Sequence, residues 1–156
     1  MRKTFLTISF VLLAISSIAQ INSEKEAVCV MKWLLENPQI ETKEIFRKKA
    51  NAISVWKLNN TINPKLHIKE KLDFIMKLGN SKYSNEFSII YDFGKFIEEF
   101  ENENYNEKLF KYYSINGVLK YYSNLIQIDE SCKIDYLDKL IVLSDEELNE
   151  KFTIEN

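Results

Sequence analysis

The sequence predicts an all-α protein: one compact domain of about six or seven amphipathic helices, residues 20–156, after a cleaved signal peptide, residues 1–19. Three Gly and two Pro in 156 residues are too few for the many turns of a β protein. Apolar residues also recur at helical spacing over several long segments. The remaining length suits a single domain with a core of its own.

The first twenty residues have the pattern of a secretory signal peptide. Arg2 and Lys3 precede an apolar run, residues 5–15, and the small residues Ser17 and Ala19 predict cleavage before Gln20. The alternative, a membrane anchor, would need about 20 apolar residues. No later segment has the length and apolar character of a membrane span, and no cysteine at the cleavage site offers a lipid anchor. We therefore expect an exported protein, periplasmic or extracellular.

The first half of the mature chain predicts three helices. Ser23 and Glu26 form a capping box, and the helix they open ends near Glu36, before Pro38. A second helix is expected over residues 42–58, with Ile45, Ala52, Ile53 and Trp56 on its core side. After a loop, an extended piece is expected over residues 66–68. A third helix then covers residues 70–78 and is ended by Gly79.

The second half predicts four more helices. The clearest covers residues 85–101, where one face gathers Ile89, Ile90, Phe93, Phe96, Ile97 and Phe100. The opposite face gathers Ser88, Tyr91, Asp92, Lys95, Glu98 and Glu99. Asn106 caps a fifth helix that reaches about Asn124, and a sixth covers residues 131–143. A second capping box at Ser144 opens a last short helix that ends near Phe152.

The fifth helix has an aromatic face beside its main apolar face. Phe110, Tyr113, Gly117 and Tyr121 lie off the stripe that contains Tyr112 and Tyr122. Glycine inside a helix costs about 1 kcal/mol, so Gly117 needs a reason. The favoured reason is close approach of another backbone of the same chain. The alternative is a partner-binding patch in which exposed tyrosines act as anchors.

Cys29 and Cys132 are the only cysteines, and export would place them in an oxidising compartment. A disulfide between them would close a loop of about 100 residues, worth roughly 4–5 kcal/mol in the chain-entropy model. Two buried free thiols are the alternative. The sequence alone leaves both open, because it does not show that the two sites meet.

Motifs for catalysis, metals or cofactors are absent from the sequence. His67 is the only histidine, without a second ligand nearby for zinc or a nucleophile motif for a hydrolase. No glycine-rich phosphate loop is present. The acidic residues between Glu98 and Glu107 and the basic run at residues 47–49 read as solvated surface. We therefore assign no catalytic residue, metal or cofactor.

Several short motifs follow one another along the mature chain: Lys32-Trp33 before Pro38, Ala50-Asn51 before Trp56, Pro64, Gly94, Asn104-Tyr105 and Gly117-Val118. In this pattern the chain resembles an uncharacterised group of small exported bacterial helical proteins. It departs from the group after the mid-helix glycine, where Lys95 precedes Phe96, and the cysteines are not part of the pattern. The resemblance implies export and a helical fold and carries no activity.

Charge and motifs together favour a non-catalytic protein. Without Arg2 and Lys3, 19 of the 21 basic residues remain against 23 acidic ones, a formal charge of −4, and no concentrated basic surface for nucleic acid is indicated. The expected function is a binding or adaptor protein for a protein partner. The alternative is an inhibitor or immunity protein against a toxin or hydrolase, and an enzyme is less expected. The sequence leaves the partner and the oligomeric state open.

Overall fold

The fold was obtained as a computed structural model, which describes residues 21–38, 43–60 and 67–153. These residues form helices and turns and no strand, so the predicted all-α class is confirmed. The seven α-helices are α2 (Glu24–Glu36), α3 (Lys43–Asn59), α4 (Ile68–Lys77), α5 (Ser84–Glu101), α6 (Phe110–Ile128), α7 (Asp135–Ile141) and α8 (Asp145–Phe152). Two 3-10 turns, η2 (Glu107–Leu109) and η3 (Glu130–Cys132), precede α6 and α7. The predicted signal peptide lies outside the described residues.

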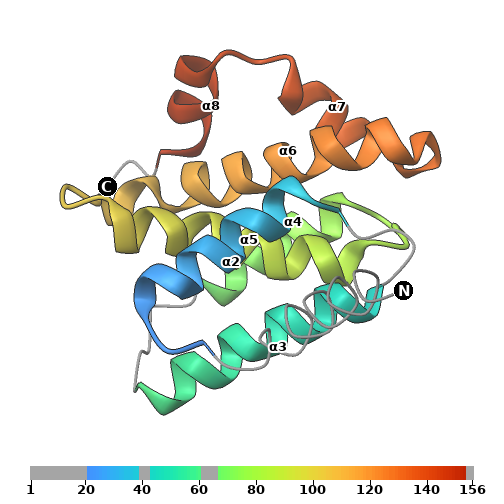
Figure 1. The fold of residues 1–156 in the computed structure, drawn as a ribbon. Coiled ribbons are helices and arrows are strands. Elements are labelled where there is room, and N and C mark those ends of the chain that lie inside the picture. The colour runs from blue at the N-terminus through green and yellow to red at the C-terminus, as the bar shows by residue number, and fades with distance from the viewer. Residues whose placement is uncertain (1–20, 39–42, 61–66, 154–156) are drawn as a thin grey trace, which may run out of the picture.

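Three helices form the centre of the molecule, and the others cover them (Figure 1). α2, α5 and α6 pack against one another, while α3 packs on α2 and α4 on α5. α7 and α8 both pack on α6, on the side away from α3 (Figure 1). Buried apolar residues from all seven helices belong to one hydrophobic core, with Phe110 of α6 outside it. None of the described helices has the length and apolar character needed to cross a membrane.

Local capping residues set several helix ends as the sequence predicts. The Ser144 hydroxyl accepts from the Glu147 amide, and the Glu147 carboxylate accepts from the Ser144 amide, so this capping box is reciprocal. At Ser23 only half of the box forms, because the Glu26 carboxylate accepts from Asn22 instead. Gly79 follows α4 with φ +61°, the left-handed conformation predicted for a terminator.

α5 is more deeply buried than its pattern predicts. Its apolar face lies in the core, but Tyr91 and Lys95, predicted on the polar face, are each only 4% exposed. The reason is that α2, α4 and α6 all pack on α5, so it has more than one buried face. The polar side predicted from the wheel is therefore wrong for these two residues, while Ser88, Asp92, Glu98 and Glu99 remain half-exposed on it.

α5 and α6 cross at two glycines. A Cβ atom placed on Gly117 would lie 2.6 Å from the Cα of Gly94, closer than such atoms approach in proteins. The favoured interpretation of Gly117, close approach of another backbone, is thus confirmed. α5 and α6 form the closest-packed helix pair of the described chain, and the two glycines permit it.

Three predicted details differ from the structure. On α3 the core face holds Phe46 and Ala50 with Ile53 and Trp56, while Ile45 is exposed, because α3 is turned to meet α2. The third helix already begins at Ile68, so this residue is not extended. The predicted sixth helix is shorter, since a 3-10 turn ending at Cys132 precedes α7.

Candidate functional site

The aromatic face of α6 is not an open binding patch. Phe110 and Tyr121 are each only 1% exposed, Gly117 contacts Gly94, and Tyr113 is half-buried against Tyr105. Tyr121 packs edge-on against Phe46 and Phe87 in the core. This is the intramolecular packing that the glycine argument favoured.

A shallow hollow of about 240 Å³ remains beside the glycine crossing. Both lysines at its rim are already paired: Lys32 with Glu101 at 2.6 Å, and Lys120 with Glu36 at 2.7 Å. The hollow therefore offers an incoming ligand few unpaired charges.

The two cysteines are free thiols, Cys29 exposed on α2 and Cys132 buried in η3. The disulfide considered from the sequence is therefore not present in the structure. The alternative, two buried free thiols, is correct for Cys132 and wrong for Cys29, which is exposed. Burial, together with the neighbouring Asp129 carboxylate, raises the pKa of the Cys132 thiol. A raised pKa disfavours the reactive thiolate form of Cys132.

A polar cluster surrounds Glu107 at one end of α5. His67 Nε2 lies 2.5 Å from one Glu107 oxygen, and the Tyr105 hydroxyl donates to the other at 2.7 Å. Lys95 lies 3.7 Å from Glu107 and also 3.7 Å from Glu99. Glu107 was predicted to be solvated surface, and its side chain is 40% exposed, but its hydrogen-bond partners also connect it to the rest of the fold.

The electrostatics of this cluster indicate a structural role. Burial opposes ionisation of Glu107, but hydrogen bonds from Tyr105 and His67 outweigh it and lower its pKa. The His67 ring stacks on Phe110 with ring centroids 3.4 Å apart, and this fixes its orientation. Through these contacts the His67 ring joins the start of α4 to η2 and to the start of α6.

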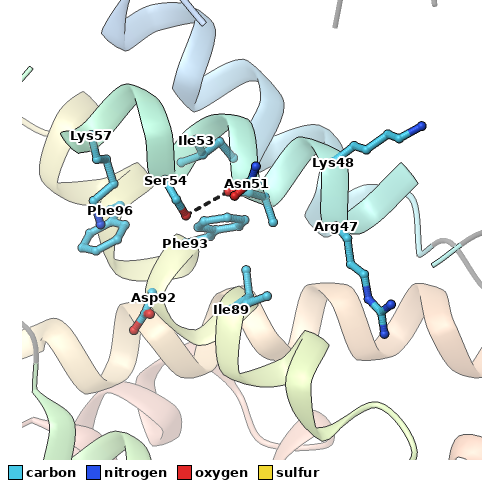
Figure 2. A pocket seen from close by; sticks show the side chains of 11 residues that line it. Arg47, Lys48, Asn51, Ile53, Ser54, Lys57, Ile89, Asp92, Phe93 and Phe96 are labelled. Carbon is cyan, nitrogen blue, oxygen red and sulfur yellow. Dashed lines mark hydrogen bonds between the residues drawn. The ribbon is translucent and has the colours of Figure 1, made fainter. Parts of the chain in front are cut away.

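A groove of about 580 Å³ lies between α3 and α5 (Figure 2). Its floor is apolar, with Phe93 in the middle between Ile53 of α3 and Ile89 of α5 (Figure 2). It exists because α3 packs chiefly on α2, so that its other side stands apart from α5. Elsewhere between the two helices, Trp56 of α3 and Phe100 of α5 are in contact, with ring centroids 6.1 Å apart.

Lys57 is the most unusual side chain of the groove. Its ammonium lies 4.0 Å from the centroid of the Phe96 ring, and Figure 2 shows the side chain extending from α3 onto that ring. Burial lowers the pKa of Lys57, although the carboxylates of Asp92 and Glu99 partly oppose this. No described carboxylate forms a salt bridge with it. A half-buried ammonium on a ring face, with no described salt bridge, has hydrogen-bonding capacity left for an anionic partner.

The remaining charges of the groove are mostly positive. Arg47 extends from α3 toward the side of Ile89, whereas Lys48 points away from the groove (Figure 2). Arg47 has no acidic partner among the described residues, and Lys48 pairs with Glu44 one turn earlier at 2.7 Å. Asp92, the one acidic residue of the lining, is paired with Lys71 at 2.6 Å. The groove therefore combines an aromatic floor with an uncompensated positive rim.

The sequence interpretation missed this groove. It treated residues 47–49 as solvated surface and gave no separate role to Lys57. One signal was present: Arg47, Asn51 and Ser54 form a polar row at helical spacing beside the core residue Ile53. Ser54 donates to the Ala50 carbonyl at 3.0 Å, which satisfies its hydroxyl within the helix. That this row faces aromatic residues of α5 follows only from the packing.

Comparison with protein-family models, curated proteins and solved structures finds no match to this chain.

Proposed function

We propose that the protein is an exported, non-catalytic binding protein that takes a segment of a protein partner into the groove between α3 and α5. The observation that carries the proposal is the Lys57 ammonium, half-buried on Phe96 without a described salt bridge. A carboxylate placed there would form a charge-assisted hydrogen bond in a partly dehydrated setting. Such bonds contribute about 1.5–3 kcal/mol.

The shape of the groove supports a protein segment rather than a small molecule. Small-molecule sites usually enclose most of their ligand, whereas this groove is a largely open depression. Its aromatic floor suits one or two large apolar side chains of a partner, as at the centre of many protein interfaces. Arg47 at the rim would steer an acidic partner toward it.

Substitution of Lys57 tests the proposal against a matched control. Lys49, also on α3, lies 4.4 Å from the Trp33 ring centroid, and burial lowers its pKa as well, but it does not line the groove. Lys57→Met should weaken the native complex by about tenfold or more, a loss of at least about 1.4 kcal/mol. Lys49→Met should leave affinity within about twofold. Equal affinities for the two variants would contradict the proposal.

Measuring the affinity and stoichiometry of the native complex by titration also separates the adaptor from the inhibitor or immunity protein. A tight complex of fixed one-to-one stoichiometry would favour the inhibitor or immunity protein. Weaker binding to several partners would favour the adaptor. Both outcomes use the same groove, so Lys57→Met is informative in either case.

A further inference from the structure

A second hollow adjoins the groove at Asp92 of α5. This hollow, about 300 Å³, lies between α4 and α5 and is lined on the α4 side by Ile68, Leu72 and Ile75. Asp92 lines both hollows, so the two meet on the surface of α5. Together they form a trough, with α3 as one wall, α4 as the other and α5 as the floor.

The two walls differ in chemistry. The α3 wall presents Arg47, Asn51 and Ser54, and the same helical row continues to Leu58. The α4 wall presents an aliphatic row in which Leu72 is 57% exposed, and Ile68 and Met76 are exposed one turn away on either side. An exposed aliphatic row on one wall of a concave surface is typical of an interaction site.

From these two walls we infer that the trough holds an amphipathic helix with an aliphatic face and an acidic edge. This inference rests on the proposed function and names its partner more closely. The aliphatic face of the helix would contact Ile68 and Leu72, and its acidic edge would lie along Arg47 and Lys57. The floor from Asn85 to Phe96 is about 17 Å long at the helical rise, so the site takes about three turns.

Charge complementarity favours this occupant. The protein as a whole has a formal charge of −2, yet Arg47, Lys57 and Lys71 line the trough against one acidic residue, Asp92. Lys48 also lines it, but points away and pairs with Glu44 (Figure 2). Because Lys71 neutralises Asp92, the α3 wall remains positive. A helix in a groove uses apolar anchors at positions i, i+4 and i+7, which is the spacing of Ile68, Leu72 and Ile75 on the facing wall. An anionic membrane would share the charge, but a flat surface fits a concave trough poorly.

Selection from a phage-displayed library of helical peptides tests the inference with the purified protein. Enriched peptides should carry aliphatic residues at i, i+4 and i+7 with acidic residues along one side. Their affinity should fall about tenfold or more with Lys57→Met and also with Leu72→Asp. It should be unchanged with Lys49→Met and with Val142→Asp, a control at an exposed apolar residue just after α7.

The outcomes separate this inference from the proposed function. Peptides lost with Lys57→Met but retained with Leu72→Asp would overturn the trough and leave the groove standing. Enrichment without acidic residues, or no enrichment over a Lys57→Met, Leu72→Asp double variant, would overturn both. If the protein binds phosphatidylglycerol vesicles and Leu72→Asp abolishes this binding, the occupant of the trough is a membrane and not a helix. If the protein dimerises and Leu72→Asp abolishes the dimer, the occupant of the trough is a second copy of the chain.

Discussion

The glycine crossing of α5 and α6 gives a prediction whose size follows from the structure. A Cβ atom on Gly117 would lie 2.6 Å from the Gly94 Cα and 3.2 Å from the Gly94 nitrogen. Carbon atoms pack best at about 3.5–4.0 Å, so Gly117→Ala must separate the two helices by about 1 Å. Both clashing atoms are backbone, and no side-chain rotation relieves them.

The expected cost is the difference of two terms. Overpacking costs about 1–3 kcal/mol, and a backbone clash belongs in the upper part of that range. Alanine regains about 1 kcal/mol because glycine is unfavourable within a helix. Gly117→Ala should therefore destabilise the protein by about 1–2 kcal/mol, or lower Tm by about 3–8 °C.

Thermal and urea unfolding, followed by circular dichroism, measure this loss. Asn116→Ala is the matched control, because Asn116 is the exposed neighbour on the same helix and should change stability by about 0.5 kcal/mol or less. Adding Gly94→Ala to Gly117→Ala should cost less than the sum of the two, since the helices are already apart. A Gly117→Ala protein as stable as the parent would refute the close crossing.

Three further predictions concern the thiols, the tyrosines and the N-terminus. Iodoacetamide should modify Cys29 in the native protein and reach Cys132 only after unfolding, and mass spectrometry that finds equal modification would contradict their placement. Burial and the hydrogen bond to Asp138 raise the pKa of Tyr122 to about 12 from an ordinary 10.0. Because the pKa of Tyr122 is higher in the folded protein than in the unfolded chain, the stability that the neutral phenol contributes is complete below pH 10 and is lost as pH rises toward 12. Tyr122→Phe should flatten that part of the stability curve in urea titrations. Intact mass after native expression should show cleavage after Ala19, and a full-length product inside the cytoplasm would remove the basis for export.

Features set by neighbouring residues could be predicted from the sequence. Ser144 with Glu147, Gly79 after α4 and the apolar face around Phe93 each depend on short spacings, and each has the predicted role. The packing role of Gly117 could also be predicted from the sequence, because a glycine inside a helix has a local cost that some contact must offset.

Features that depend on how helices pack could not be predicted in this way. Periodicity identifies the most apolar face of α5, but it does not reveal that Lys95 is buried on another face. His67 and Glu107 are 40 residues apart and meet only in the folded chain. The groove likewise depends on α3 packing against α2, a choice that the α3 sequence alone does not determine.

Site-specific photo-crosslinking in the native organism tests the binding groove most directly. A benzophenone side chain at Asn51, which is exposed and lines the groove, should form an adduct with one acidic segment of a protein partner. The same group at Lys139, exposed on α7, should not form it. Adding Lys57→Met should abolish the Asn51 adduct, and adding Lys49→Met should leave it intact. An Asn51 adduct that persists with Lys57→Met, or equal adducts from both positions, would contradict the account.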